Sequence, residues 1–265
     1  MTGPPFSFGL LPLSAPLPGS SFTDLLTSLD LAPRWEVPAE GRVSAPEATT
    51  VLAVCYQGGV VMAGDRQATE GYSVAHRRIQ KVFPADRYSV VAISGTAGLA
   101  MELVKLFQVE LEHYEKLEGL RLTLEGKANF LARLVRGQLP MAFQGLVVVP
   151  LFAGFDEAAD VGRLYTFDVV GGRYEEQDYG AAGSGSREAK SFLRTVYRTD
   201  LDEATAIDIS VRALVAAAAE DLATGGPDLR RNILPNVYLI DRNGVSEPPT
   251  DRLEASARQA LESSP

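Results

Sequence analysis

Residues 49–65, TTVLAVCYQGGVVMAGD, give the clearest indication of the fold. They contain two apolar runs rich in β-branched residues, 50–56 and 60–64, separated by Gln57-Gly58-Gly59. Gly-Gly between two such runs favours a tight hairpin, because positive φ costs glycine little. Both alternating faces of the first run are apolar, so we expect this hairpin to be covered on both sides.

The chain beyond residue 65 predicts further strands and paired helices. The expected strands lie at residues 80–83, 89–94, 145–152, 163–169, 173–179 and 236–240, and the expected helices at residues 97–117, 126–139, 187–197, 203–222 and 251–263. Hairpin connections between strands indicate antiparallel sheets, and helices that come in pairs can cover the outer faces of two stacked sheets. The sequence therefore predicts an α+β fold, a four-layer αββα sandwich of two antiparallel sheets.

The composition changes upstream of this hairpin. Residues 1–48 are rich in Pro, Ser and Gly and contain one short helical candidate at residues 22–31. The segment has no basic start, and prolines interrupt its weakly apolar stretch, which argues against a signal peptide. Composition alone leaves two interpretations open: a disordered tail and a removable pro-segment.

Bulk composition excludes several classes of function. The 265 residues suffice for one large domain, and the net charge of −9 leaves no basic excess for displacing the counterions of a nucleic acid. Cys55 is the sole cysteine, so no intrachain disulfide can form, and a reducing, cytoplasmic location is the natural expectation. None of the apolar runs is long enough to cross a bilayer, so we expect no membrane association.

Four residues beside the predicted hairpin are candidates for chemistry. Thr49 opens the first strand, although threonine is common at strand starts and means little by itself. Asp65 ends the second strand, Lys81 lies in the third, and Gly95 directly precedes a helix. An Asp and a Lys on separate strands are usually surface charges. Their shared position beside the start of a buried hairpin makes these two candidates for catalysis.

The order of the motifs resembles the proteasome β-type subunits, a family of N-terminal nucleophile hydrolases. The matching segments are TTVLA at 49–53, GGVVMAGDR at 58–66, Lys81, SGTAG at 94–98, GSGS at 183–186 and DLATGGPD at 221–228. The segment VELEHYEKLEG at 109–119 is similar to the actinobacterial branch of that family. Each piece is short, but the ordered set is specific, and it covers essentially all of the chain from Thr49 onward.

The resemblance implies a threonine endopeptidase that processes itself. The chain would be cut between Ala48 and Thr49, so that residues 1–48 are a propeptide and residues 49–265 are the catalytic domain. Thr49 would be the nucleophile, with Asp65 and Lys81 as its partners. Ser184, Asp221 and Thr224 would form a supporting network near the new amino terminus. Gly95 would supply the backbone N–H of the oxyanion hole.

Substrate binding is also implied by the resemblance. An extended peptide would pair with the backbone near Thr69 and Ala97. The first specificity pocket would be lined by small or aliphatic residues, which favours cleavage after apolar residues: Ala68, Ile79, Ile93 and Ala97.

The implied chemistry is physically sound. A threonine hydroxyl is a poor nucleophile and needs a base. Once Thr49 is the amino terminus, its α-amine, with an ordinary pKa of roughly 8, can accept the hydroxyl proton near neutral pH. While residues 1–48 remain attached, that nitrogen is an amide without such basicity. A cationic Lys81, held by Asp65, would favour the developing alkoxide, and the Gly95 N–H would stabilise the oxyanion.

By the same resemblance, seven-membered β rings stack in pairs and are capped by rings of α-type subunits. An ATPase ring would feed unfolded polypeptide into them, and no cofactor or metal is implied. Other motifs in the sequence are weak. His76 and His113 lie in no cluster with ligand spacing, and residues 183–191 end in Lys190-Ser191 but have Ala189 where a phosphate-binding loop needs glycine.

Two departures from the family pattern keep alternatives open. Ala48 stands where glycine usually precedes the nucleophile, and its Cβ could slow self-cleavage. Gln67 stands where most β-type subunits have arginine. The smaller bacterial ATP-dependent relative of the proteasome also has glutamine at this position. One alternative is therefore a catalytically silent ring subunit that keeps residues 1–48. The other is that smaller protease, which would assemble without α-type partners.

Overall fold

The predicted hairpin at residues 50–64 forms the centre of the first sheet. β1 (Thr50–Tyr56) pairs antiparallel with β2 (Gly59–Gly64), and Tyr56 lies opposite Gly59. The structure is a computed structural model that describes residues 49–70 and 73–263, so the predicted helix at 22–31 and Ala48 lie outside the described residues. Gly59 fits closely, because a Cβ there would lie 2.0 Å from the Ile240 carbonyl oxygen.

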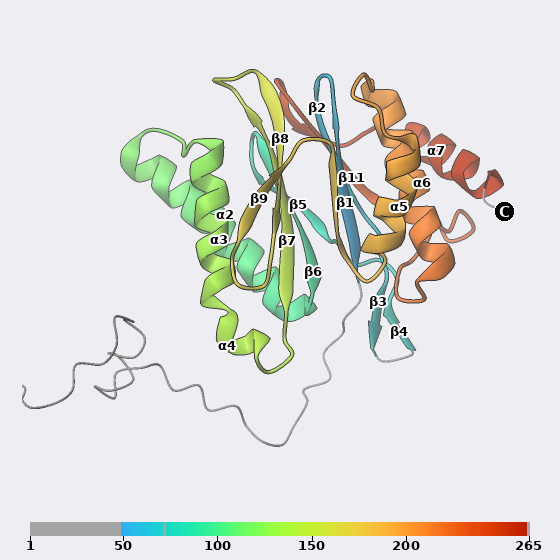
Figure 1. Ribbon diagram of the computed structural model, residues 1–265, viewed down its shortest axis with the longest axis horizontal. Coiled ribbons are helices and arrows are strands. Elements are labelled where there is room, and N and C mark those ends of the chain that lie inside the picture. Colours follow the sequence, from blue (N-terminus) through green and yellow to red (C-terminus); the bar gives the residue numbers. More distant parts are fainter. Residues whose placement is uncertain (1–48, 71–72, 264–265) are drawn as a thin grey trace, which may run out of the picture. The chain divides into compact units, whose positions relative to one another are not determined.

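In the described residues, two five-stranded sheets and a small ribbon make up the β-structure, and all the pairings between these strands are antiparallel (Figure 1). The first sheet has the order β10-β1-β2-β11-β12, with β10 at Tyr179–Gly183, β11 at Asn236–Asp241 and β12 at Gly244–Ser246. The second has the order β5-β6-β7-β8-β9, with bounds Val82–Asp86, Ser89–Gly95, Val148–Asp156, Val161–Phe167 and Arg173–Glu176. The ribbon pairs β3 (Ala68–Glu70) with β4 (Ser73–His76).

Helices cover the outer face of each sheet. α2 (Ala97–Glu118) and α3 (Leu124–Gly137) pack on the second sheet and are followed by the short α4 (Leu139–Ala142). α5 (Ser186–Val196) and α6 (Glu203–Glu220) pack on the first sheet, and α7 (Thr250–Glu262) packs on α6. Among the described residues, no helix has the length and apolar character that a bilayer span requires.

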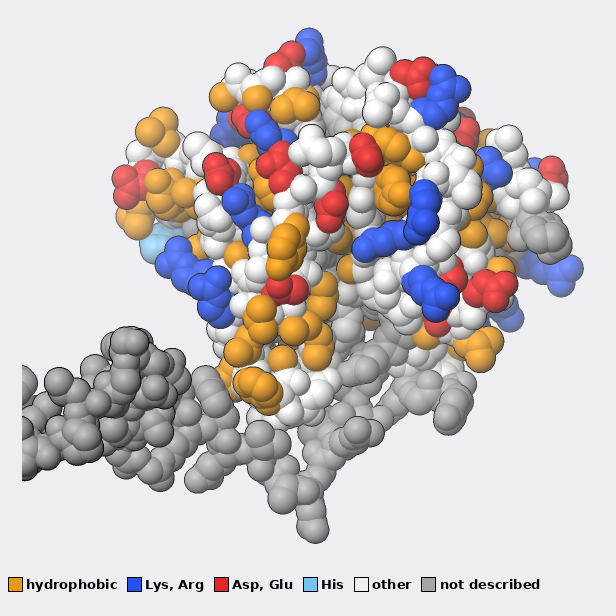
Figure 2. Space-filling model, viewed as in Figure 1, with side chains coloured by type: hydrophobic (Ala, Val, Ile, Leu, Met, Phe, Trp, Pro, Cys, Tyr) orange, Lys and Arg blue, Asp and Glu red, His pale blue; other side chains and the backbone are white. Residues whose placement is uncertain are grey.

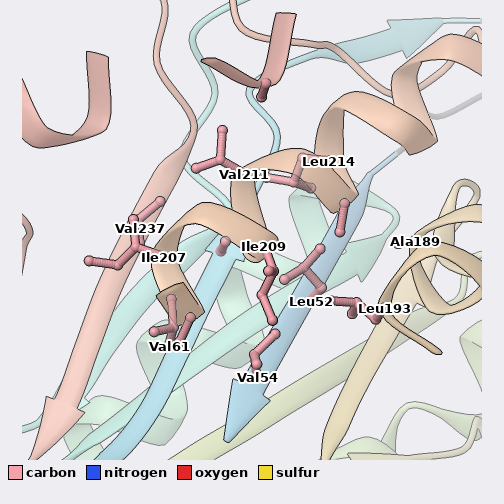
Figure 3. Packing of buried hydrophobic residues seen from close by; sticks show 14 of the residues in the cluster. Leu52, Val54, Val61, Ala189, Leu193, Ile207, Ile209, Val211, Leu214 and Val237 are labelled. Carbon is pink, nitrogen blue, oxygen red and sulfur yellow. The ribbon is translucent and has the colours of Figure 1, made fainter. Parts of the chain in front are cut away.

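Three apolar clusters fill the spaces between the four layers. Alternation along β1 directs Leu52 and Val54 toward α5 and α6 (Figure 3), whereas Val51 and Ala53 face the second sheet. On β6 the same period of two directs Val91 and Ile93 toward α2 and α3. The predicted four-layer αββα sandwich of two antiparallel sheets is confirmed.

The largest departure from the sequence prediction concerns residues 173–179. They do not form one strand: β9 ends at Glu176, and β10 begins at Tyr179 in the other sheet, beside β1. The β-pattern of the segment is correct, but periodicity does not report which sheet a strand joins. This crossing brings Gly183 opposite Thr50 and the start of α5 close to the start of β1.

Smaller differences occur at the element ends and in short elements. The strand expected at 145–152 lies at Val148–Asp156, and α3 begins at Leu124, where the Thr123 side chain accepts a hydrogen bond from the Gly126 N–H. The ribbon strands, α4 and β12 were not predicted, because elements of three or four residues carry little periodic signal.

Candidate active site

The backbone of Thr49 is fixed by the end of β10. Its carbonyl oxygen accepts a hydrogen bond from the Ser184 N–H at 3.1 Å, and only 8% of the residue is exposed. Gly183 approaches so closely, with φ +102°, that a Cβ there would lie 1.5 Å from the Thr49 carbonyl oxygen. Only glycine permits this contact, so the crossing strand β10 determines where Thr49 sits.

Lys81 and Asp65 form a buried ion pair next to the start of β1. Lys81 Nζ lies 2.5 Å from Asp65 Oδ1, and the two side chains are 2% and 0% exposed. Asp65 also accepts three backbone N–H bonds of 2.9 Å, from Thr50, Gln67 and Gly225. With these donors and Lys81, the carboxylate is held in one orientation, and the ammonium is held with it.

Burial and charge act in opposite directions on Lys81. Desolvation lowers the pKa of its ammonium from the ordinary value, while the charge and hydrogen bond of Asp65 favour the protonated form. Lys81 Nζ also donates to the Gln67 carbonyl oxygen. The pKa of Lys81 is therefore set by two opposing influences, burial and the adjacent carboxylate.

A small pocket brings six of the sequence candidates together. It is lined by Thr49, Lys81 and Gly95, and also by three of the residues expected in the first specificity pocket: Ile79, Ile93 and Ala97. Ala68 and Thr69, on β3, are buried but do not line this pocket. The arrangement places a hydroxyl, a cation and a glycine backbone around one apolar hollow.

Gly95 occupies a position that excludes a side chain. Its φ is +101°, and a Cβ there would lie 2.0 Å from the Val147 carbonyl oxygen. It ends β6 opposite Val148, and the next residue, Thr96, is the N-cap of α2. Its backbone is therefore held rigidly at the edge of the pocket, as an oxyanion donor would have to be.

Ser184, Asp221 and Thr224 form one hydrogen-bonded network. The Asp221 carboxylate accepts from the hydroxyls of Ser184 and Thr224, each at 2.5 Å. Because the Thr224 hydroxyl already donates to Asp221, the 2.6 Å contact with the Thr50 hydroxyl requires Thr50 to be its donor. Thr50 Oγ1 in turn accepts from the Gly185 N–H at 2.9 Å.

Two members of the site were not assigned a role from the sequence. Thr50 links the network to β1, but a second threonine at a strand start carries no distinguishing signal. Gln67 joins two loops: its N–H binds Asp65, and its side-chain Nε2 donates to the Leu222 carbonyl oxygen at 3.0 Å. Gln67, which stands where the family usually has arginine, thus makes a defined structural contact.

A larger cavity of about 490 Å³ opens on the other side of Thr49. Its walls come from the ends of β6, β7 and β8 in the second sheet, from β10 in the first sheet, and from the first turns of α5. Thr49, Ser94 and Gly95 line both this cavity and the small pocket. Thr49 therefore lines two neighbouring hollows, one small and one large.

A four-layer αββα sandwich whose first central strand starts at a threonine, next to a buried lysine, is the architecture of the N-terminal nucleophile hydrolases. Comparison with known proteins is more specific. The sequence model of the family described as "Proteasome subunit" matches residues 46–228. The chain belongs to the proteasome subunit family, and within it to the β type, the protease component of the core.

Three curated relatives carry the name "Proteasome subunit beta". The protein from Acidothermus cellulolyticus is 51% identical over 98% of this chain and 93% of its own length. The protein from Acidimicrobium ferrooxidans is 53% identical over 93% of this chain and 92% of its own length. The protein from Streptomyces griseus is 51% identical over 97% of this chain and 93% of its own length. These three relatives favour the proteasome β type over the smaller bacterial ATP-dependent protease.

Proposed function

We propose that this chain is a threonine-type endopeptidase whose nucleophile is the Thr49 hydroxyl, exposed when residues 1–48 are removed. The observation that carries the proposal is the pocket that Thr49 shares with Lys81 and Gly95. The buried Lys81–Asp65 pair supplies the fixed positive charge that a nucleophilic hydroxyl needs beside it. A charged pair buried only for stability would need no such pocket.

The proposed reaction uses the residues in these positions. The Thr49 Oγ–H bond breaks as the α-amine of the same residue takes the proton, and Oγ forms a bond to the substrate carbonyl carbon. The Gly95 N–H stabilises the resulting oxyanion by on the order of 3 kcal/mol. The α-ammonium then gives its proton to the leaving amine, and the C–N bond breaks. Water hydrolyses the ester on Oγ by the same route and restores the hydroxyl and the amine.

The surrounding residues position this proton transfer. Lys81, oriented by Asp65, lowers the cost of negative charge on Oγ. The Ser184–Asp221–Thr224 network lies beside the backbone of residues 49 and 50, where the new amino terminus would form. Its carboxylate favours the α-ammonium, the form in which the amine carries the proton to the leaving group.

In this proposal the propeptide, residues 1–48, keeps the chain inactive until it is removed. An amide nitrogen at Thr49 cannot serve as the base, so residues 1–48 keep the chain inactive until cleavage at Ala48–Thr49. The alignment with the Acidothermus relative covers 98% of this chain, so it extends well into this segment. A leader that belongs to the family pattern is consistent with a processing function.

The working assembly that we propose is a pair of stacked seven-membered β rings between rings of α-type subunits. An ATPase ring would deliver unfolded polypeptide to it in the cytoplasm. The β-type relatives support assembly with α-type subunits, and the ATPase partner remains an expectation from the resemblance. Co-expression with an α-type chain, followed by native mass spectrometry, tests the composition of the particle.

Substitution of the nucleophile tests the activity. We expect Thr49→Ala to abolish hydrolysis of a fluorogenic peptide by the assembled particle, whereas Thr49→Ser, which keeps both the hydroxyl and the amine, retains measurable activity. Thr195→Ala removes a hydroxyl from the exposed face of α5 and serves as the control. Full activity of Thr49→Ala would contradict the proposal, whereas a wild-type particle without activity would favour the silent ring subunit.

A further inference from the structure

The 490 Å³ cavity beside Thr49 has a wall that the proposed chemistry does not use. Ser186 and Lys190 both line it, and they lie four residues apart on α5, on one face of the helix. The close contact between Gly183 and the Thr49 carbonyl fixes the start of this helix near the nucleophile. The position of Lys190 relative to Thr49 is therefore set by β10 and one helical turn.

The arrangement of the two hollows around Thr49 assigns the larger cavity to the part of the substrate that leaves after cleavage. Thr49 and Gly95 line both hollows, so the peptide group under attack would lie between them. The small apolar pocket with Ile79 and Ile93 is the expected place for the residue that supplies the carbonyl. The larger cavity is then left for the residues that follow the scissile bond.

Lys190 and Ser186 are the donors in this cavity that have no other use. Apart from the Thr49 hydroxyl, the proposed nucleophile, the other hydroxyls on its walls already donate to the protein: Ser94 to the Val149 carbonyl, Thr166 to Glu176 and Ser184 to Asp221. Within the described part of the chain, neither Ser186 Oγ nor Lys190 Nζ has a hydrogen-bond or ion-pair partner. The positive end of the α5 dipole adds to the same potential.

A preference of this cavity for a negatively charged side chain would have to come from its own lining and not from the net charge of the chain. The chain carries a net charge of −9, which by itself repels acidic ligands. Figure 2 shows basic and acidic side chains interspersed over the visible face, without a broad basic field. Any attraction of an acidic side chain to this cavity must therefore come from the groups that line it.

We propose that Lys190, with Ser186, forms a subsite that favours a carboxylate side chain on the first or second residue after the scissile bond. The proposal rests on Thr49 acting as the nucleophile. Val149 and Leu151 provide an apolar wall for the methylene groups, and Lys190 lies within reach of the charged end. The subsite would select the residues after the scissile bond, in addition to the apolar residue expected before it.

Internally quenched peptides test the subsite. Matched substrates carry Glu, Gln or Lys at the two positions after one scissile bond, and the assembled particle cleaves them. For the wild type we expect kcat/KM to be about threefold to fivefold higher for Glu than for Lys, as for a partly exposed ion pair. Lys190→Glu should reverse the order, and Lys190→Met should abolish it.

Two controls separate this inference from the proposed function. Arg194→Glu makes the same charge change one turn further along α5, outside the cavity, and should leave the order unchanged. A fluorogenic amide with no residue after the scissile bond should be cleaved equally by Lys190→Glu and the wild type. If Lys190→Glu cleaves that amide but still cleaves the Glu substrate faster than the Lys substrate, the subsite proposal is contradicted. The proposal that Thr49 is the nucleophile is then unaffected. Loss of all cleavage in the wild type overturns both.

Discussion

The described part of the chain contains two largely buried Lys–Asp pairs with the same N–O distance and different surroundings. Lys81–Asp65 and Lys127–Asp86 both have an N–O distance of 2.5 Å. The side chains are 2% and 0% exposed in the first pair, and 6% and 16% exposed in the second. The N–O distance therefore does not distinguish the proposed catalytic pair from the other one.

The neighbours of each pair do distinguish them. Asp86 also accepts hydrogen bonds from the Tyr88 N–H and the Ser89 hydroxyl, so the second pair joins helix α3 to the turn between β5 and β6. Lys81 instead lines a pocket together with Thr49. A lysine becomes a candidate for catalysis when its charge faces a hydroxyl and a space for substrate, and burial alone is not sufficient.

The largest expected effect comes from exchanging each lysine for methionine. Lys81→Met should lower peptidase activity by about 10²–10⁴-fold, the range for loss of a group that assists proton transfer. Lys127→Met should retain near wild-type activity per assembled particle. Peptide hydrolysis normalised to particle concentration measures both. Equal losses in the two variants would remove the functional distinction between the pairs.

The unfolding free energy tests the structural role of the Lys127–Asp86 pair. Lys127→Met leaves Asp86 without its cation and should cost about 3 kcal/mol of unfolding free energy, as for a broken buried pair. The double variant Lys127→Met, Asp86→Asn should recover part of that loss, because no carboxylate is then left uncompensated. Chemical denaturation of the full-length chain measures both. An unchanged midpoint for Lys127→Met would contradict a structural role for this pair.

A smaller effect is expected in the network beside Thr49. Thr224→Val removes the hydroxyl between Thr50 and Asp221 and leaves the Thr50 donor unsatisfied, so we expect about a tenfold loss of kcat. Thr224→Ser keeps the hydroxyl and should remain within about twofold of the wild type. Steady-state kinetics of assembled particles decides the matter, and full activity of the valine variant would exclude a positioning role.

The smallest expected effect concerns Ala48. Ala48→Gly removes a Cβ that we expect to hinder the turn required for self-cleavage, so self-cleavage should be about twofold to fivefold faster. The appearance of processed chain over time on a denaturing gel measures the rate. A slower rate in the glycine variant would show that Ala48 is not the obstacle.

Much of this molecule was accessible from its sequence. The Gly-Gly hairpin and the paired helices predicted the layers, because period-two and helical patterns report burial directly. Thr49, Asp65 and Lys81 were found through the order of the motifs, and the structure places Thr49 and Lys81 around one pocket and joins Lys81 to Asp65.

The parts that sequence reasoning missed depend on which strands pair and on single contacts. Residues 173–179 gave no sign of changing sheets, and this crossing is what fixes Thr49 and α5. Thr50 and Gln67 act through hydrogen bonds to residues far away in the chain. Lys190 attracted notice only as the end of a failed phosphate-loop motif, because its role requires knowledge of the cavity wall.

The intact mass of the chain in an active particle tests the central claim most directly. One residue, Thr49, is proposed to supply both the attacking oxygen and, through its freed amine, the group that takes the proton. The mass should correspond to a chain that starts at Thr49, and the Thr49→Ala particle should keep residue 48 joined to residue 49. An active particle built only from the unprocessed 28.5 kDa chain would contradict this account.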